Sequence, residues 1–221
     1  MPTTAFTSEP STVTVTGTAT ATAVPDIVRL TIGVSVTQTA VSDAFDAVAR
    51  LSTALTETLH ARGVRGADLT TAGLSVHPQT HWSDGGRQET TGFTASTTFR
   101  VVLRELEPEA ANSPAAVIAA CVSVGGDAIR LDGLEFDLDD RSDLATRARE
   151  LAWTAAESKA RQFADLADKD LVEVLEVLED FDQIVPMRGR VAAMKADSAP
   201  IAVERGEIEE SISVRVRWAM A

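Results

Sequence analysis

The amino-acid sequence predicts an α+β fold in which mainly antiparallel sheets pack against one or two long helices. Three features of the 221-residue chain lead to this class: segments in which apolar and polar residues alternate, segments in which apolar residues recur every three or four positions, and short breaks between them. In order, the segments read β-β-α-β-β-α-β-α-β-β. They form either one α+β unit or two βαββ halves that share a core, because the pattern from residue 27 recurs loosely from residue 128.

Two strands are predicted at the start of the chain. Residues 12–23 place threonines on one face and valine, glycine or alanine on the other, and Pro25-Asp26 ends this strand. Apolar residues at alternate positions from Val28 to Val36 form the second strand, and we expect the two to pair as an antiparallel hairpin. Residues 1–11 precede the pattern and are expected to be disordered, so the domain covers residues 12–221.

A helix and a second pair of strands follow. Apolar residues recur with helical spacing over 41–59, with Thr39 or Ser42 available as the N-terminal cap and Gly63 as the end. Alternating segments then predict strands at 71–76 and 93–103. The polar residues between these strands, His77 to Thr91, read as a loop centred on the turn signal Asp84-Gly85-Gly86.

The second half of the chain predicts two helices and three strands. We expect a helix from Glu107 to Gly125, a strand over 129–138 with a bulge at Asp132-Gly133, and an alanine-rich helix with Asp140 as its cap and Asp143 at its third position. The sheet-facing side of that helix is predicted to contain Leu144, Ala148, Ala152, Ala155, Phe163 and Leu166. Strands at 171–180 and 207–218 complete the fold, and residues 187–206 form a long loop between them.

Composition limits the possible partners and location. A net charge of −13 repels phosphate backbones, so nucleic acid is a poor partner. The single cysteine, Cys121, lies in an apolar run and is expected to be a small buried hydrophobe rather than a nucleophile. Residues 1–6 show no export signal, and no segment approaches the roughly 20 apolar residues of a membrane span. These observations predict a cytoplasmic protein without a membrane span.

The loop after residue 76 holds the candidate interaction site: His77, His81, Trp82 and Asp84. Trp82 exposes costly apolar area unless a protein interface or its own sheet covers it. The two histidines, with Asp84 and Glu89, are a weaker candidate for a metal site, because Pro78 disfavours the helix that would bring them together. No metal or cofactor is therefore predicted.

Two other candidate sites are set aside. Four aspartates crowd together as in a calcium loop but lack its glycine and distal glutamate, so we interpret them as helix caps: Asp137, Asp139, Asp140 and Asp143. The chain also has no Gly-x-Ser-x-Gly motif and no phosphate-binding glycine loop. No set of side chains commits the protein to a reaction.

Several short phrases, in order and spacing, resemble the SIMPL-domain family over roughly residues 12–218. The resemblance implies an α+β fold, higher oligomers that include ring or channel-like assemblies, and for some members a link to oxidative stress. It implies no established catalytic residues, and the bacterial members include periplasmic and outer-membrane-associated proteins. The matching phrases are Val13–Gly17, Val24–Asp26, Ile32–Val34, Arg62–Val64, Asp68–Thr71, Val76–Pro78, Gly92–Ala95, Lys159-Ala160, Leu166-Ala167, Pro200-Ile201 and Gly206-Glu207.

The first functional hypothesis is therefore a non-enzymatic homo-oligomeric module for assembly or protein interaction, with a stress-related role as an extension. The alternative is a metal- or small-molecule-dependent stress enzyme that uses His77 and His81. A third hypothesis is a membrane-associated structural protein exported by another route.

Overall fold

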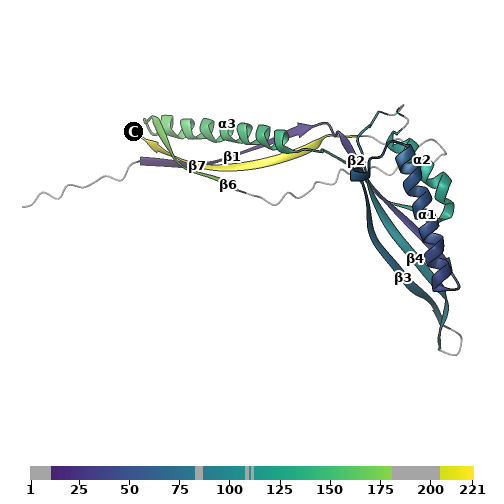
Figure 1. Cartoon of the computed structure of the whole chain (residues 1–221). Coiled ribbons are helices and arrows are strands. Elements are labelled where there is room, and N and C mark those ends of the chain that lie inside the picture. The colour runs from purple at the N-terminus through teal and green to yellow at the C-terminus, as the bar shows by residue number, and fades with distance from the viewer. Residues whose placement is uncertain (1–10, 83–86, 108–109, 111, 181–204) are drawn as a thin grey trace, which may run out of the picture. The chain divides into compact units, whose positions relative to one another are not determined.

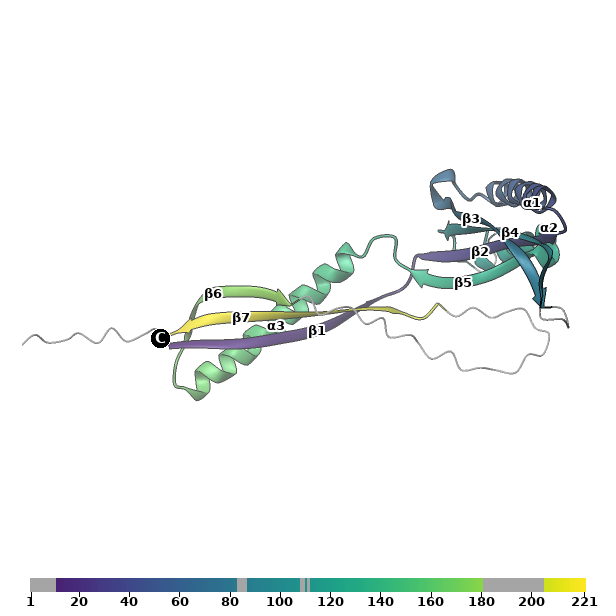
Figure 2. The same ribbon diagram turned by 90° about the horizontal axis from the view of Figure 1, so that it is seen from below.

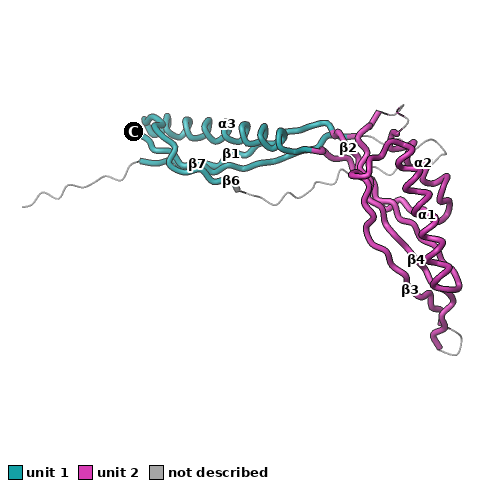
Figure 3. Tube along the Cα trace, viewed as in Figure 1, with its two compact units in different colours: residues 1–24, 140–199, 206–221 teal, residues 25–139, 200–205 magenta. Residues whose placement is uncertain are grey.

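The computed structural model describes residues 11–82, 87–107, 110, 112–180 and 205–221 (Figure 1). Within these residues, seven strands and three α-helices follow one another in the predicted order, which confirms the α+β class. The chain divides into two compact units, coloured separately in Figure 3. Unit 1 combines the two ends of the chain, residues up to 24, 140–199 and 206–221, whereas unit 2 contains residues 25–139 and 200–205.

Unit 2 is a four-stranded antiparallel sheet covered by two helices. Its strand order is β3-β4-β2-β5, and α1 packs on β2 and β4 with α2 beside it (Figure 2). Alternate residues of β2 and β4 meet the helices, so the core contains Leu30, Phe99, Leu55 and Cys121. The element bounds are β2 (Ile27–Gln38), α1 (Val41–Ala61), β3 (Leu69–Trp82), β4 (Gln88–Leu103), α2 (Pro114–Gly125) and β5 (Ile129–Asp137).

Unit 1 is a three-stranded antiparallel sheet with one long helix. Its strand order is β1-β7-β6, and α3 lies along one face, against β1 and β7 (Figure 2). The opposite face of β1 carries the threonines, as the alternation predicted. The element bounds are β1 (Ser11–Ala23), α3 (Ser142–Leu166), β6 (Leu171–Asp180) and β7 (Ile208–Met220).

The predicted hairpin between the first two strands is wrong. β1 pairs with β7 along its whole length, from Ser11 opposite Met220 to Ala23 opposite Ile208. β2 instead pairs with β4 on one side and β5 on the other. Because both edges of β2 are occupied, no edge remains for β1, and Pro25 connects two sheets rather than two paired strands.

The alanine-rich helix packs closely on its sheet, but on a face that differs from the predicted one. The buried positions advance by four residues at each step and include Ala156 in place of Ala155, which is only partly buried. Phe163 and Leu166 are 53% and 77% exposed, so they lie outside the interface. The buried stripe consists of Leu144, Ala148, Ala152, Ala156, Ala160 and Ala164.

Helix ends and bulges agree with the sequence in part. Gly63 ends α1 with a φ of 82°, as predicted, whereas Ala40 is the N-cap and supplies no side-chain hydrogen bond. The register of β5 against β2 shifts at Asp132, which confirms the predicted bulge. The helix expected from Glu107 begins only at Pro114, because the Ser113 side chain caps it there.

Two predicted segments without regular structure fall mainly outside the described residues. Residues 1–10 of the predicted N-terminal segment are not described, and Ser11 already belongs to β1. Residues 187–204 of the predicted long loop are also outside, while 205 and 206 precede β7.

Candidate functional site

The predicted interaction loop is largely a strand. His77, His81 and Trp82 belong to β3, where Trp82 pairs with Gln88 of β4, and Asp84 lies outside the described residues. Pro78 fits this arrangement because β3 is an edge strand, which has one side without ladder hydrogen bonds. The loop prediction missed that pairing with β4 can hold a polar segment in extended form.

The side chains of this hairpin end face solvent. Trp82 is 65% exposed, so it does not pack on its own sheet. His77 and His81 are four residues apart in a strand, a separation of about 13 Å, which is too long for two ligands of one ion. Within the described residues, no group of three or more His, Cys, Asp or Glu side chains could hold a metal ion.

The aspartates around the start of α3 have separate structural partners. Asp140 was predicted as the cap of α3, but the N-cap is Arg141, which makes no side-chain capping hydrogen bond; Asp140 accepts a hydrogen bond from the Ser142 amide at 2.8 Å. Asp137 instead accepts from Arg29 Nε at 2.8 Å, and Asp139 pairs with Arg104. The capping interpretation therefore does not hold for Asp137 and Asp139, because nearby arginines hold their carboxylates.

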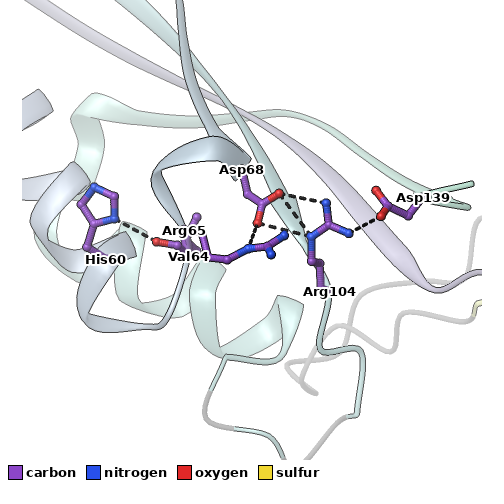
Figure 4. A network of polar contacts seen from close by, with 6 residues as sticks. All are labelled: His60, Val64, Arg65, Asp68, Arg104 and Asp139. Atoms are coloured by element: carbon purple, nitrogen blue, oxygen red, sulfur yellow. Dashed lines mark hydrogen bonds and ion pairs between the residues drawn. The ribbon is translucent and has the colours of Figure 1, made fainter.

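A network of charged residues that the sequence analysis missed lies at one end of unit 2 (Figure 4). Asp68 accepts from Arg65 Nε at 2.6 Å and from Arg104 Nη2 at 3.1 Å, and it is only 7% exposed. Arg104 Nη1 also donates to Asp139 at 2.5 Å. The Arg65–Asp68 spacing of three residues was a local signal, but Arg104 directly follows the end of β4 and could not be found from spacing.

The network changes the acidity of its members. Hydrogen bonds from Arg65 and Arg104 lower the pKa of Asp68, and the hydrogen bond from Arg104 lowers the pKa of Asp139. The same carboxylates raise the pKa of Arg104. All of these groups are therefore charged at neutral pH, so none is suited to proton transfer.

Cys121 is a poor nucleophile. It is 2% exposed in the core of unit 2, and burial raises the pKa of its thiol to about 11. Because the thiolate is the reactive form, the thiol is inert at neutral pH. The expectation of a small buried hydrophobe is confirmed.

The outer edge of unit 1 exposes a second feature. β6 has β7 as its partner on one side and no described strand on the other. Five of its six valines and leucines are exposed: Val172 63%, Val174 43%, Leu175 40%, Val177 49% and Leu178 46%. The β-branched residues of 171–180 predicted this strand but not its exposure.

Comparison with known proteins gives a consistent picture. The family model SIMPL, described as "Protein of unknown function (DUF541)", matches residues 13–218. The 26 kDa periplasmic immunogenic proteins of Brucella melitensis biotype 1 and Brucella abortus strain S19 are each 29% identical over 222 residues. The aligned region covers 96% of this chain and 85% of each relative.

These relatives correct the predicted location. Both are named as periplasmic proteins, so the prediction of a cytoplasmic protein is contradicted. That prediction used only the residues at the start of the chain, whereas the similarity extends over the fold. In the described part of the chain, no helix combines the length and the apolar character needed to cross a membrane. Since the family model covers nearly all of the sequence, the chain belongs to the SIMPL family, whose function is unknown.

Proposed function

We propose that this protein is a non-enzymatic assembly module of the periplasm that forms homo-oligomers by adding strands at the edges of the unit 1 sheet. The observation that carries the proposal is the outer edge of β6, with five apolar side chains that are 40–63% exposed. The periplasmic location is proposed from the names of the two relatives.

An edge of this kind is unusual in a protein that acts alone. Natural edge strands are commonly protected by lysine, proline or short length, because unpaired backbone groups attract another strand. β6 has ten residues and contains neither lysine nor proline; of its four acidic residues, which can also protect an edge, Glu176 and Glu179 pair with arginines of their own unit. Its exposed apolar residues lie on both faces, since Val177 is opposite the buried Val216 and Leu178 is opposite the exposed Arg215. A strand added beside β6 would cover residues on both faces.

The preferred occupant of this edge is β1 of a second copy. β1 is the other edge of the same sheet, thirteen residues long, and it contains no charged side chain. Two β6 strands would bring their acidic residues together, although Glu176 and Glu179 already pair with Arg217 and Arg149 of their own unit. Pairing of β6 with β1 uses two different surfaces, so it extends into a ring or a filament.

The hairpin end of β3 and β4 is a second proposed interaction surface. Its described residues include His77, His81 and Trp82, all exposed; Asp84, the fourth residue of the predicted site, lies outside the described residues. Large exposed aromatic side chains are typical anchors of protein interfaces. No observation on the described residues favours the metal-dependent enzyme.

The test measures oligomer mass by light scattering during size-exclusion chromatography at micromolar concentrations. In one variant, Leu175→Lys/Leu178→Lys, charges are placed on the β6 edge, and in another, Thr12→Lys/Thr22→Lys, they are placed on the exposed face of β1. We expect both variants to lose the oligomer, because either change affects one half of a β6–β1 contact. A control variant, Val122→Lys/Leu166→Lys, changes two exposed apolar residues on helices, 51% and 77% exposed, and is expected to keep its mass.

The alternatives give different results. A wild-type mass of one 23.4 kDa chain throughout the concentration range contradicts the proposal. Loss of the oligomer only in the β6 variant indicates pairing of two β6 strands, which contradicts the β6–β1 arrangement but retains assembly. Loss in the control variant as well shows that general apolar surface, rather than the sheet edge, holds the copies together.

A further inference from the structure

Three arginines meet at one cavity in unit 2, between the end of α1 and the end of β4. The cavity has a volume of about 190 Å³. One buried water needs roughly 10–15 Å³ of such a cavity, so this cavity is large enough for a small hydrated ion. The lining residues are Arg62, Arg65, Asp68, Arg104, Glu105 and Asn112, with Gly63, Val64, Val102 and Leu103.

Hydrogen bonds order three of the charged residues that line this cavity, Arg65, Asp68 and Arg104. Asp68 holds Arg65 and Arg104 together, and Arg104 is held at its other end by Asp139 (Figure 4). Two guanidinium groups that would otherwise repel each other therefore lie beside one shared carboxylate. Because these side chains are already ordered, binding of a ligand here costs little of their conformational entropy.

Arg65 retains the capacity to bind a further group. Its Nε donates to Asp68, but within the described residues its two terminal nitrogens have no hydrogen-bond partner. The side chain is 61% exposed, so these nitrogens can be reached from solvent. A guanidinium presents its terminal N–H groups as a planar fork that fits the oxygens of carboxylate and phosphate.

The charges around the cavity are balanced, so the preference for an anion comes from the terminal nitrogens of Arg65 rather than from net charge. Arg62, Arg65 and Arg104 contribute three positive charges, and Asp68 with Asp139 contributes two negative ones. Glu105, which lines the cavity and is exposed as Arg65 is, contributes a third negative charge that opposes an anion. The Asn112 amide supplies an uncharged donor from a different segment of the chain.

We propose that this cavity is a binding site for a small oxyanion, recognised by the terminal nitrogens of Arg65 together with Arg62. The ligand class is a carboxylate or phosphate group, free or as part of a small metabolite. Asp68, Arg104 and Asp139 position Arg65, and Glu105 weakens binding by repulsion. The site lies within unit 2 and does not depend on assembly of the chain.

The experiment titrates the full chain with sodium phosphate and, separately, sodium acetate, against sodium chloride at constant ionic strength. Binding is followed by the ¹H–¹⁵N signals of the arginine Nε–H groups. We expect the signals of Arg65 and Arg104 to shift and saturate with phosphate or acetate but not with chloride. The better of the two anions identifies the ligand group.

Three variants separate a site from general charge screening. Arg65→Gln removes the guanidinium group and should weaken anion binding about tenfold, which is the effect of one charge-assisted contact. Arg62→Gln removes the second cation and should also weaken binding. Glu105→Gln should tighten binding, which a purely structural network does not explain. The control is Arg161→Gln on α3, which changes an arginine of similar exposure, 69%, and should leave binding unchanged.

Two results overturn the proposal. One is a linear response to all three salts in which Arg65 behaves like Arg161. The other is equal affinity in wild type, Arg65→Gln and Arg62→Gln, each shown to be folded by its melting curve. If Arg65→Gln does not fold, the Arg62→Gln and Glu105→Gln variants decide the question alone.

Discussion

Gly17 is the point of closest approach between strand β1 and helix α3, and replacing it with alanine tests how unit 1 is packed. A Cβ at this position lies 2.0 Å from the Ala152 carbonyl oxygen and 2.4 Å from the Ala156 amide nitrogen. The first distance is about 1.4 Å shorter than the 3.4 Å at which ordinary contact begins. Both obstacles are backbone atoms of the helix, so no side chain can rotate away to make room.

The expected loss of stability follows from this geometry. To accept one methyl group, α3 must move away from β1, and the stripe of fully buried alanines loses contact with the sheet. Overpacking in a core costs about 1–3 kcal/mol when side chains can adjust, so we expect about 3 kcal/mol or more for Gly17→Ala. For a chain of this size, that corresponds to a fall in Tm of roughly 6–12 °C.

The assay is thermal unfolding followed by far-ultraviolet circular dichroism. The matched control is Gly66→Ala, because an added Cβ there has no atom within 4 Å and the backbone is not left-handed. The control is expected to melt within a few degrees of wild type, since a compatible Gly→Ala change is worth only about 0.4–1 kcal/mol. If Gly17→Ala has the same Tm as the Gly66→Ala control, α3 does not pack on β1 as described.

The other predictions concern the hairpin end and the charged network. Trp82→Ala should leave Tm nearly unchanged, because the side chain is 65% exposed, and should lower the oligomer mass; a lower Tm with unchanged mass would remove this surface from the proposal. Asp68→Asn should destabilise the protein at neutral pH. Since the folded pKa of Asp68 is lowered below 3.8, its contribution is complete above that value and is lost as the pH falls through the lowered pKa. The difference in denaturant stability between wild type and Asp68→Asn should therefore shrink in acid, and a constant difference would contradict this linkage.

The order and type of the elements could be predicted because their signals are local. The alternation along residues 12–23 matches the burial of β1, with Val15, Gly17 and Ala21 turned inward. A change of phase in the apolar pattern was sufficient to place the bulge at Asp132. In each case the backbone geometry of one segment fixes which side chains share a face.

The candidate site was less predictable, because the composition of a segment does not reveal which strand it pairs with. The segment from His77 to Trp82 is polar, contains a proline and reads as a loop, yet β4 supplies hydrogen bonds that hold it as a strand. For β6, the sequence could not show which side of the strand would be covered. The exposure of a side chain depends on which elements pack against it, and few elements pack against the apolar residues of β6.

Only the tertiary structure decided which segments meet. The partner of β1 is β7, and Thr18 contacts Ser213 across 195 positions of sequence, whereas its neighbour β2 lies in another sheet. Arg104 meets Asp68 across 36 positions to build the charged cavity. The sequence by itself determined the elements, since φ, ψ and side-chain period are set within a few residues. It did not determine their partners, because strand edges offer the same backbone donors and acceptors, and the choice among them depends on how the whole chain buries its apolar faces.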